Sequence, residues 1–169
     1  MILFHLHLSQ TFALVLFLIF FIKVEGTELE CREPFVYFQK YCYYFSSQQM
    51  PFRSAKEFCN SYGFPSHPCH LTSIHSSEEN SFVHHRATQL WANPIYWLGA
   101  TKSSNFGYLS WLDRSWVNFT KFRPFGNEGW CVQQTEQQVW DDTNCAHSNY
   151  FVCKKVADIA VICKYFVRF

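Results

Sequence analysis

Cysteine is the residue that most constrains how this chain folds. The sequence holds eight cysteines in 169 residues, a density typical of small proteins that mature in an oxidising compartment, where disulfides persist. Three of them frame the C-terminal half, because Cys131, Cys145 and Cys153 surround the stretch Trp140-Asp141-Asp142. This pattern predicts a strand, an acidic turn and a second strand. The clustered carboxylate oxygens of the turn are ligands that suit a hard cation such as calcium.

The N-terminal segment predicts export. Phe12 to Ile22 is an unbroken apolar run, which matches the core of a signal peptide in length and is short for a membrane span. Small residues near Gly26 favour cleavage after that position, so we expect residues 1–26 to be a signal peptide and the protein to be secreted. The lack of Lys and Arg before the run leaves a signal anchor as the rival interpretation, which the missing stalk before Cys31 disfavours.

Local patterns predict the elements that follow. Cys31 and Cys42 enclose an aromatic segment typical of a small hairpin. Phe52 to Tyr62 has apolar residues at helical spacing and is followed by a glycine. Ser76 and Glu79 have the spacing of a capping box, so a second helix should begin there and run to about Leu90. Tyr96 to Ala100 predicts a buried strand.

Together these segments resemble the long form of a C-type lectin-like domain. The resemblance extends from about Cys31 to Lys155 and includes a Trp111-Leu112-Asp113-Arg114-Ser115 turn, in which Arg114 replaces the family's glycine. It implies an α+β fold with two helices, small antiparallel sheets and a long irregular loop region held by disulfides. We therefore assign residues 27–155 to this domain and 156–169 to an apolar C-terminal extension. The resemblance also implies three disulfides, namely Cys31–Cys42, Cys59–Cys153 and Cys131–Cys145.

Two cysteines lie outside the family pairs. Cys69 and Cys163 either bond to each other, link two chains or remain free, and we favour the intrachain Cys69–Cys163 bond because the tail is long enough to fold back. The β-rich segment Asp158 to Phe169 then forms either an added edge strand or a contact surface. Linkage between chains would instead give a homodimer.

The family's calcium site is altered in this sequence. Where the family carries Glu-Pro-Asn, this chain has Arg123-Pro124-Phe125. Arginine offers only donors and phenylalanine offers no ligand, which leaves a half-site of Glu128, Asp141 and Asp142. We expect Arg123 to pair with Asp142 in place of a cation. No cofactor is therefore expected, and any calcium binding should be weak.

Two tryptophans flank the altered loop and are candidates for stacking on sugar rings. Packing of Trp116 and Trp130 against the loop itself is the alternative. Asn118-Phe119-Thr120 is an N-glycosylation sequon in a predicted surface loop. The candidate ligand-binding residues are Arg123, Phe125, Glu128, Asp141, Asp142, Trp116 and Trp130.

These patterns favour a non-catalytic extracellular recognition module. Its expected partner is a glycan, by resemblance, or a protein that is bound without calcium. A toxin-like subunit of a disulfide-linked dimer is the alternative. A net charge of +1 does not indicate nucleic-acid binding. No membrane anchor is expected. A catalytic Cys69 is disfavoured, because a cysteine in a chain rich in disulfides is more often half of a bond.

Overall fold

The computed structural model describes residues 22–102, 108–123 and 129–165, with the backbone alone for 22–26 and 161–165. The chain divides into two units, Cys31–Ala157 and a second made of the segments on either side of it. The elements are β1 (Ile22–Glu30), β2 (Val36–Phe38), β3 (Tyr41–Phe45), β4 (Met50–Pro51), α2 (Phe52–Ser61), β5 (His70–Leu71), α3 (Ser77–Leu90), β6 (Tyr96–Lys102), β7 (Leu109–Trp111), β8 (Cys131–Gln134), β9 (Trp140–Thr143), β10 (Ser148–Val156) and β11 (Asp158–Tyr165).

Strand β10 is the centre of the larger unit. It pairs antiparallel with β3, β4 and β5, and parallel with β6. Strand β6 continues the sheet to β7 and β8, and β9 forms a hairpin with β8. The predicted α+β class with small antiparallel pairings is confirmed, and the parallel contact between β6 and β10 joins its two parts.

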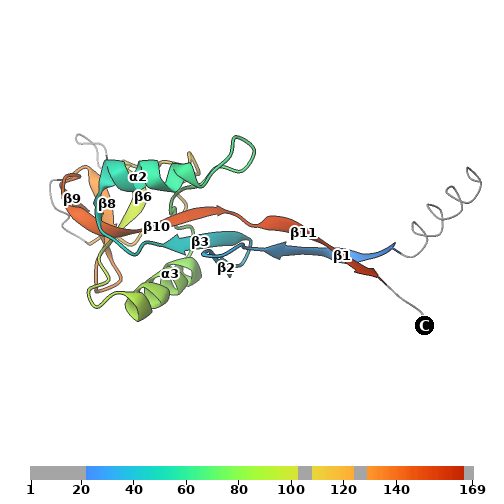
Figure 1. Ribbon diagram of the computed structural model, residues 1–169. Helices are drawn as coiled ribbons and strands as arrows, with labels where there is room; N and C mark the ends of the chain where they lie inside the picture. Colours follow the sequence, from blue (N-terminus) through green and yellow to red (C-terminus); the bar gives the residue numbers. More distant parts are fainter. Residues whose placement is uncertain (1–21, 103–107, 124–128, 166–169) are drawn as a thin grey trace, which may run out of the picture. The chain divides into compact units, whose positions relative to one another are not determined.

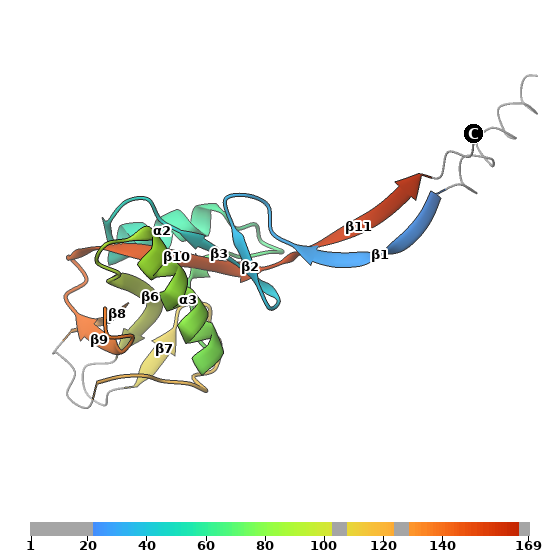
Figure 2. The same cartoon turned by 90° about the horizontal axis from the view of Figure 1, so that it is seen from below.

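Helices α2 and α3 lie on opposite sides of the β3–β10 pair (Figures 1 and 2). Helix α2 buries Phe52, Ala55 and Cys59, the face that the helical spacing predicts. Helix α3 starts where the capping box predicts, since the Ser76 side chain accepts a hydrogen bond from the Glu79 backbone at 3.1 Å. None of the helices in the described residues is long and apolar enough to cross a membrane.

Aromatic side chains fill the core between these layers. Trp140 is fully buried, and the rings of Trp111, Phe119 and Phe122 meet it edge-on at 5.5–5.8 Å between centroids. This arrangement suits the ring quadrupoles. Gly99 allows β6 to approach β5, because a Cβ built at this position would lie 2.1 Å from the Leu71 carbonyl oxygen.

The three expected disulfides hold the larger unit together. Cys31–Cys42 closes the N-terminal hairpin, Cys59–Cys153 ties α2 to β10, and Cys131–Cys145 clips the β8–β9 hairpin. The suggested fourth bond is not formed, since the Cys69 thiol is free and buried. Burial raises the pKa of this thiol to about 12, which suppresses the reactive thiolate.

The C-terminal extension pairs with the segment that precedes the domain. Strands β1 and β11 form an antiparallel ribbon in which Leu29 lies opposite Ile159 and Val24 lies opposite Cys163. This pairing occupies the backbone of the tail. The side chain of Cys163 lies outside the described residues. Cleavage after Gly26, which stays a prediction, would divide β1.

Candidate functional site

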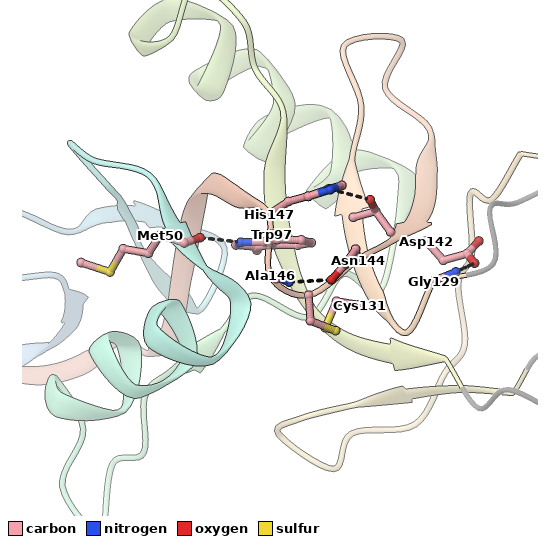
Figure 3. The surroundings of a disulfide bond; sticks show 10 residues. Met50, Trp97, Gly129, Cys131, Asp142, Asn144, Ala146 and His147 are labelled. Atoms are coloured by element: carbon pink, nitrogen blue, oxygen red, sulfur yellow. Dashed lines mark hydrogen bonds between the residues drawn. A yellow bond between two sulfur atoms is a disulfide. The ribbon is translucent and has the colours of Figure 1, made fainter.

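The predicted acidic turn is a strand whose carboxylates face inward. Asp141 and Asp142 lie in β9, and they are 6% and 0% exposed. The Asp142 carboxylate accepts hydrogen bonds from the Gly129 backbone at 2.8 Å (Figure 3) and from the Lys102 ammonium at 3.1 Å. Asp141 accepts from the Asp142 backbone at 3.1 Å. These aspartates therefore stabilise the β8–β9 region from within.

The partner that we expected for Asp142 is wrong. Arg123 is exposed and donates to the Gln137 side-chain oxygen at 2.8 Å, whereas Lys102 from β6 takes the position beside Asp142. Lys102 is better placed because β6 runs alongside β8, the strand that pairs with β9. Its side chain is 29% exposed and reaches the buried carboxylate from the surface.

The residues present do not fit a calcium ion. One oxygen of Asp142 is already shared by an ammonium and an amide, and the other is buried without a hydrogen-bond partner in the described structure. Glu128 and Phe125 lie outside the described residues. Within the described ranges, no group of three or more His, Cys, Asp and Glu side chains is arranged to hold a metal, whereas calcium takes at least about six oxygen ligands.

The two candidate tryptophans are both at the surface. Trp116 is 91% exposed and Trp130 is 58% exposed, whereas residues 124–128 of the altered loop lie outside the described residues. Trp116 follows the turn in which Arg114 has a φ of 64°. This is the left-handed conformation that glycine adopts most easily, and it explains why the family has glycine at this position.

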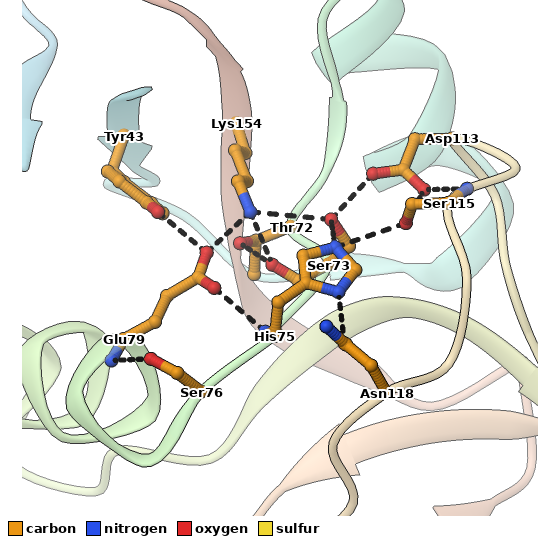
Figure 4. Close-up of polar contacts among 10 residues, drawn as sticks. All are labelled: Tyr43, Thr72, Ser73, His75, Ser76, Glu79, Asp113, Ser115, Asn118 and Lys154. Carbon is orange, nitrogen blue, oxygen red and sulfur yellow. Dashed lines mark hydrogen bonds and ion pairs between the residues drawn. The ribbon is translucent and has the colours of Figure 1, made fainter. Parts of the chain in front are cut away.

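A buried ion pair lies beneath α3 that sequence analysis missed. Glu79 turns into the core, where its carboxylate contacts the Lys154 ammonium at 2.5 Å and the Tyr43 hydroxyl at 2.6 Å (Figure 4). Burial lowers the pKa of Lys154, although the charge of Glu79 opposes this effect. Burial together with Glu79 raises the pKa of Tyr43. The signal in the sequence was a lysine at the end of the apolar run Phe151-Val152-Cys153.

A second polar cluster lies beside this pair and lines a shallow pocket of about 220 Å³. Asp113 accepts hydrogen bonds of 2.5 Å from both Ser73 and Ser115 (Figure 4). Burial by itself raises the pKa of Asp113, but the hydrogen bonds from Ser115 and Ser73 outweigh it and hold the pKa below its ordinary 3.8.

This cluster superficially matches a nucleophile and its base. The His75 ring lies 3.1 Å from the Ser115 hydroxyl oxygen and 2.8 Å from Asn118. The hydroxyl proton of Ser115, however, points to Asp113, and an activated serine must give its proton to the base. The geometry therefore favours a structural role for the cluster.

The sequence matches the family model described as the lectin C-type domain over residues 48–155. The chain belongs to the C-type lectin domain family. Among the relatives of this C-type lectin domain, Snaclec 5 of Echis pyramidum leakeyi is 29% identical over 143 residues, which are 83% of this chain and 92% of that protein. One chain of the snaclec salmorin from Gloydius brevicauda is 30% identical over 142 residues, covering 81% of this chain and 90% of the other.

Solved structures agree with this assignment. The C-type lectin domain superposes on a calcium-independent type II antifreeze protein with a TM-score of 0.67 at 27% identity, covering 78% of this chain and 98% of the other. Family membership explains the order of the elements and the three disulfides.

Proposed function

We propose that the chain is a secreted recognition module that binds a glycan or protein ligand without calcium. The observation that carries this proposal is the ion pair between Lys102 and the fully buried Asp142. The Lys102 ammonium, which is part of the protein itself, supplies the positive charge that a bound cation would otherwise bring to this carboxylate. The N-terminal apolar run and the three disulfides support export.

The exposed rings supply a binding surface. Trp116 and Trp130 present large apolar faces to solvent, and such rings stack on sugars and serve as anchors in protein interfaces. Arg123 adds hydrogen-bond donors beside the altered loop, since its side chain is exposed. Recognition through these groups needs no metal.

Calorimetric titration with calcium tests the absence of a cation site. We expect no binding tighter than about 1 mM for the wild-type protein, because the weak end of extracellular calcium modules lies there. The double variant Arg123→Glu and Phe125→Asn restores the family triplet but should still bind poorly, since Lys102 occupies Asp142. Adding Lys102→Gln should raise the affinity at least about tenfold, whereas Lys102→Gln alone serves as the matched control. Micromolar calcium binding by the wild type would overturn the proposal.

A glycan array probed with and without EDTA identifies the ligand class. Binding that survives EDTA and is lost in Trp116→Ala or Trp130→Ala supports calcium-independent glycan recognition. Binding that EDTA abolishes contradicts it. If the array gives no hits and the protein captures a defined extracellular protein, the same surface is inferred to bind a protein ligand.

A second candidate function is that of a subunit in a covalent dimer. The salmorin relative is itself named as a subunit, and this chain has cysteines beyond its three bonds. Cys69 is 1% exposed, which removes it as an interchain link and leaves Cys163. Electrophoresis without reductant should show a dimer that Cys163→Ser abolishes and Cys69→Ser preserves. A monomeric wild-type band would reject this candidate.

A further inference from the structure

The most exposed tryptophan of the chain precedes the glycosylation sequon by two residues. Trp116 leaves 91% of its surface to solvent, and the sequon begins at Asn118. A ring of this size forgoes substantial stabilisation when it stays in water. A sugar attached to Asn118, two residues away, would lie close enough in sequence to cover this ring.

The residues on either side of Trp116 are anchored, so its neighbours hold the backbone of this segment in place while the ring faces solvent. Before it, the Ser115 backbone and hydroxyl donate to Asp113 at 2.9 and 2.5 Å. After it, the Phe119 ring packs edge-on against the buried Trp140 at 5.6 Å between centroids. These contacts fix the segment between Ser115 and Phe119 while leaving Trp116 outside.

The amide of Asn118 is oriented for modification. Its side-chain oxygen lies 2.8 Å from Nδ1 of His75, within hydrogen-bond distance (Figure 4). That contact uses the oxygen and leaves Nδ2, the atom that carries an N-glycan, on the other branch of the amide. Asn118 itself is exposed, so the sugar has room to attach.

We propose that the innermost N-acetylglucosamine of a glycan on Asn118 packs against the indole of Trp116 and removes this ring from the recognition surface. Transfer forms the bond between Nδ2 and C1 of the sugar and breaks the bond from C1 to the diphosphate of a lipid-linked donor, which leaves as the amide loses a proton. Residues two apart in sequence lie within about 7 Å, a span that one sugar bridges. Its C–H face is apolar and suits the negative face of the indole.

The proposal rests on the secretion that the proposed function includes, and it turns the glycan into a regulator of that surface. Chains with an occupied Asn118 offer Trp130 to a ligand, whereas unmodified chains offer Trp116 as well. The test is made without any ligand, so that its failure is separate from a failure of calcium-independent recognition.

Fluorescence quenching by acrylamide measures the covering of Trp116. The chain has six tryptophans, and all except Trp116 and Trp130 are at most 6% exposed. In a Trp130→Phe background, quenching therefore reports Trp116. We expect the quenching constant of the secreted glycoprotein to be about three- to fivefold lower than that of Thr120→Ala. This variant keeps Asn118 but loses the sequon. A difference of this size corresponds to an aromatic contact of ordinary strength.

Two matched controls separate the innermost sugar from the rest of the glycan. Trimming with an endoglycosidase that leaves one N-acetylglucosamine should keep the low quenching constant. Thr120→Ser preserves the sequon and should behave as the parent protein does. The Trp116→Ala substitution should lower the melting temperature of the glycosylated protein by about 2–6 °C and that of Thr120→Ala by much less.

Mass spectrometry of the peptide that contains Asn118 establishes occupancy. An unmodified Asn118 in the secreted protein would overturn the proposal at its first step. An occupied Asn118 with the same quenching constant as Thr120→Ala would overturn the packing of the sugar on Trp116. Protection that persists only with the full glycan would also refute it, because the contact is assigned to the first sugar.

Discussion

Replacing Lys154 by methionine tests the buried ion pair most directly. Methionine keeps the length and apolar character of the side chain but removes the ammonium that contacts Glu79 at 2.5 Å and the Ser73 carbonyl at 3.0 Å. Both side chains of the pair are 5% exposed, so water cannot solvate the carboxylate that remains. Removing one partner of such a pair costs about 3–5 kcal/mol.

That loss is large against the usual stability of a domain, about 5–15 kcal/mol. It corresponds to a fall of roughly 10–20 °C in melting temperature for a domain of this size. Urea titration with the disulfides intact measures the free energy of unfolding from the midpoint and slope. Arg53→Met is the matched surface control, because the Arg53–Glu57 pair has side chains that are 90% and 64% exposed, and it should leave the midpoint essentially unchanged.

The rescue variant decides whether the buried charge is the cause. Glu79→Gln in the Lys154→Met background replaces the carboxylate by a neutral amide, which is able to accept from the His75 backbone and donate to the Tyr43 hydroxyl. These partners lie at 2.8 and 2.6 Å in the wild type. We expect the double variant to recover at least about half of the loss, as strongly coupled sites do. Additive losses, or a Lys154→Met variant within about 1 kcal/mol of the wild type, would refute this reasoning.

Three further predictions concern other described residues. Alkylation of Cys69 at pH 8 should be slow in the native protein and fast in urea, since burial raises its pKa to about 12; rapid native labelling, located by mass spectrometry, would contradict the buried position. The pKa of Asp113 is held below its ordinary 3.8, so its contribution to stability is present above that value and is lost as the pH falls through the folded pKa. Acid titration of the unfolding free energy should show this loss, and a Ser115→Ala variant should show a smaller loss over the same pH range, because removing this donor lets the folded pKa of Asp113 rise toward its ordinary value. Gly99→Ala should destabilise the domain by about 3 kcal/mol or more in urea titration, because its Cβ would lie 2.1 Å from a backbone oxygen of β5; an unchanged midpoint would show that β5 and β6 shift apart freely.

The sequence by itself determined the features that depend on neighbours along the chain. The start of α3 follows from Ser76, whose hydroxyl needs only the backbone amide of Glu79 three residues on. Hairpins closed by nearby cysteines, such as Cys31–Cys42, are likewise local. The pair Cys59–Cys153 is distant in sequence and was available only through the resemblance to a known family.

The tertiary structure decided what each side chain contacts across the fold. Local spacing makes Glu79 a capping residue, yet folding brings Lys154 to it from 75 positions away and turns its carboxylate into the core. Sequence reasoning gave Asp142 the wrong cationic partner, because the order of β6, β8 and β9 places Lys102 beside it across 40 residues. The anchors of the segment that holds Trp116 depend on the fold in the same way, since Ser73 donates to Asp113 across 40 residues and Phe119 packs on the ring of Trp140. Contacts of this kind depend on how strands pair and layers pack. No single local pattern of residue types along the chain predicts them.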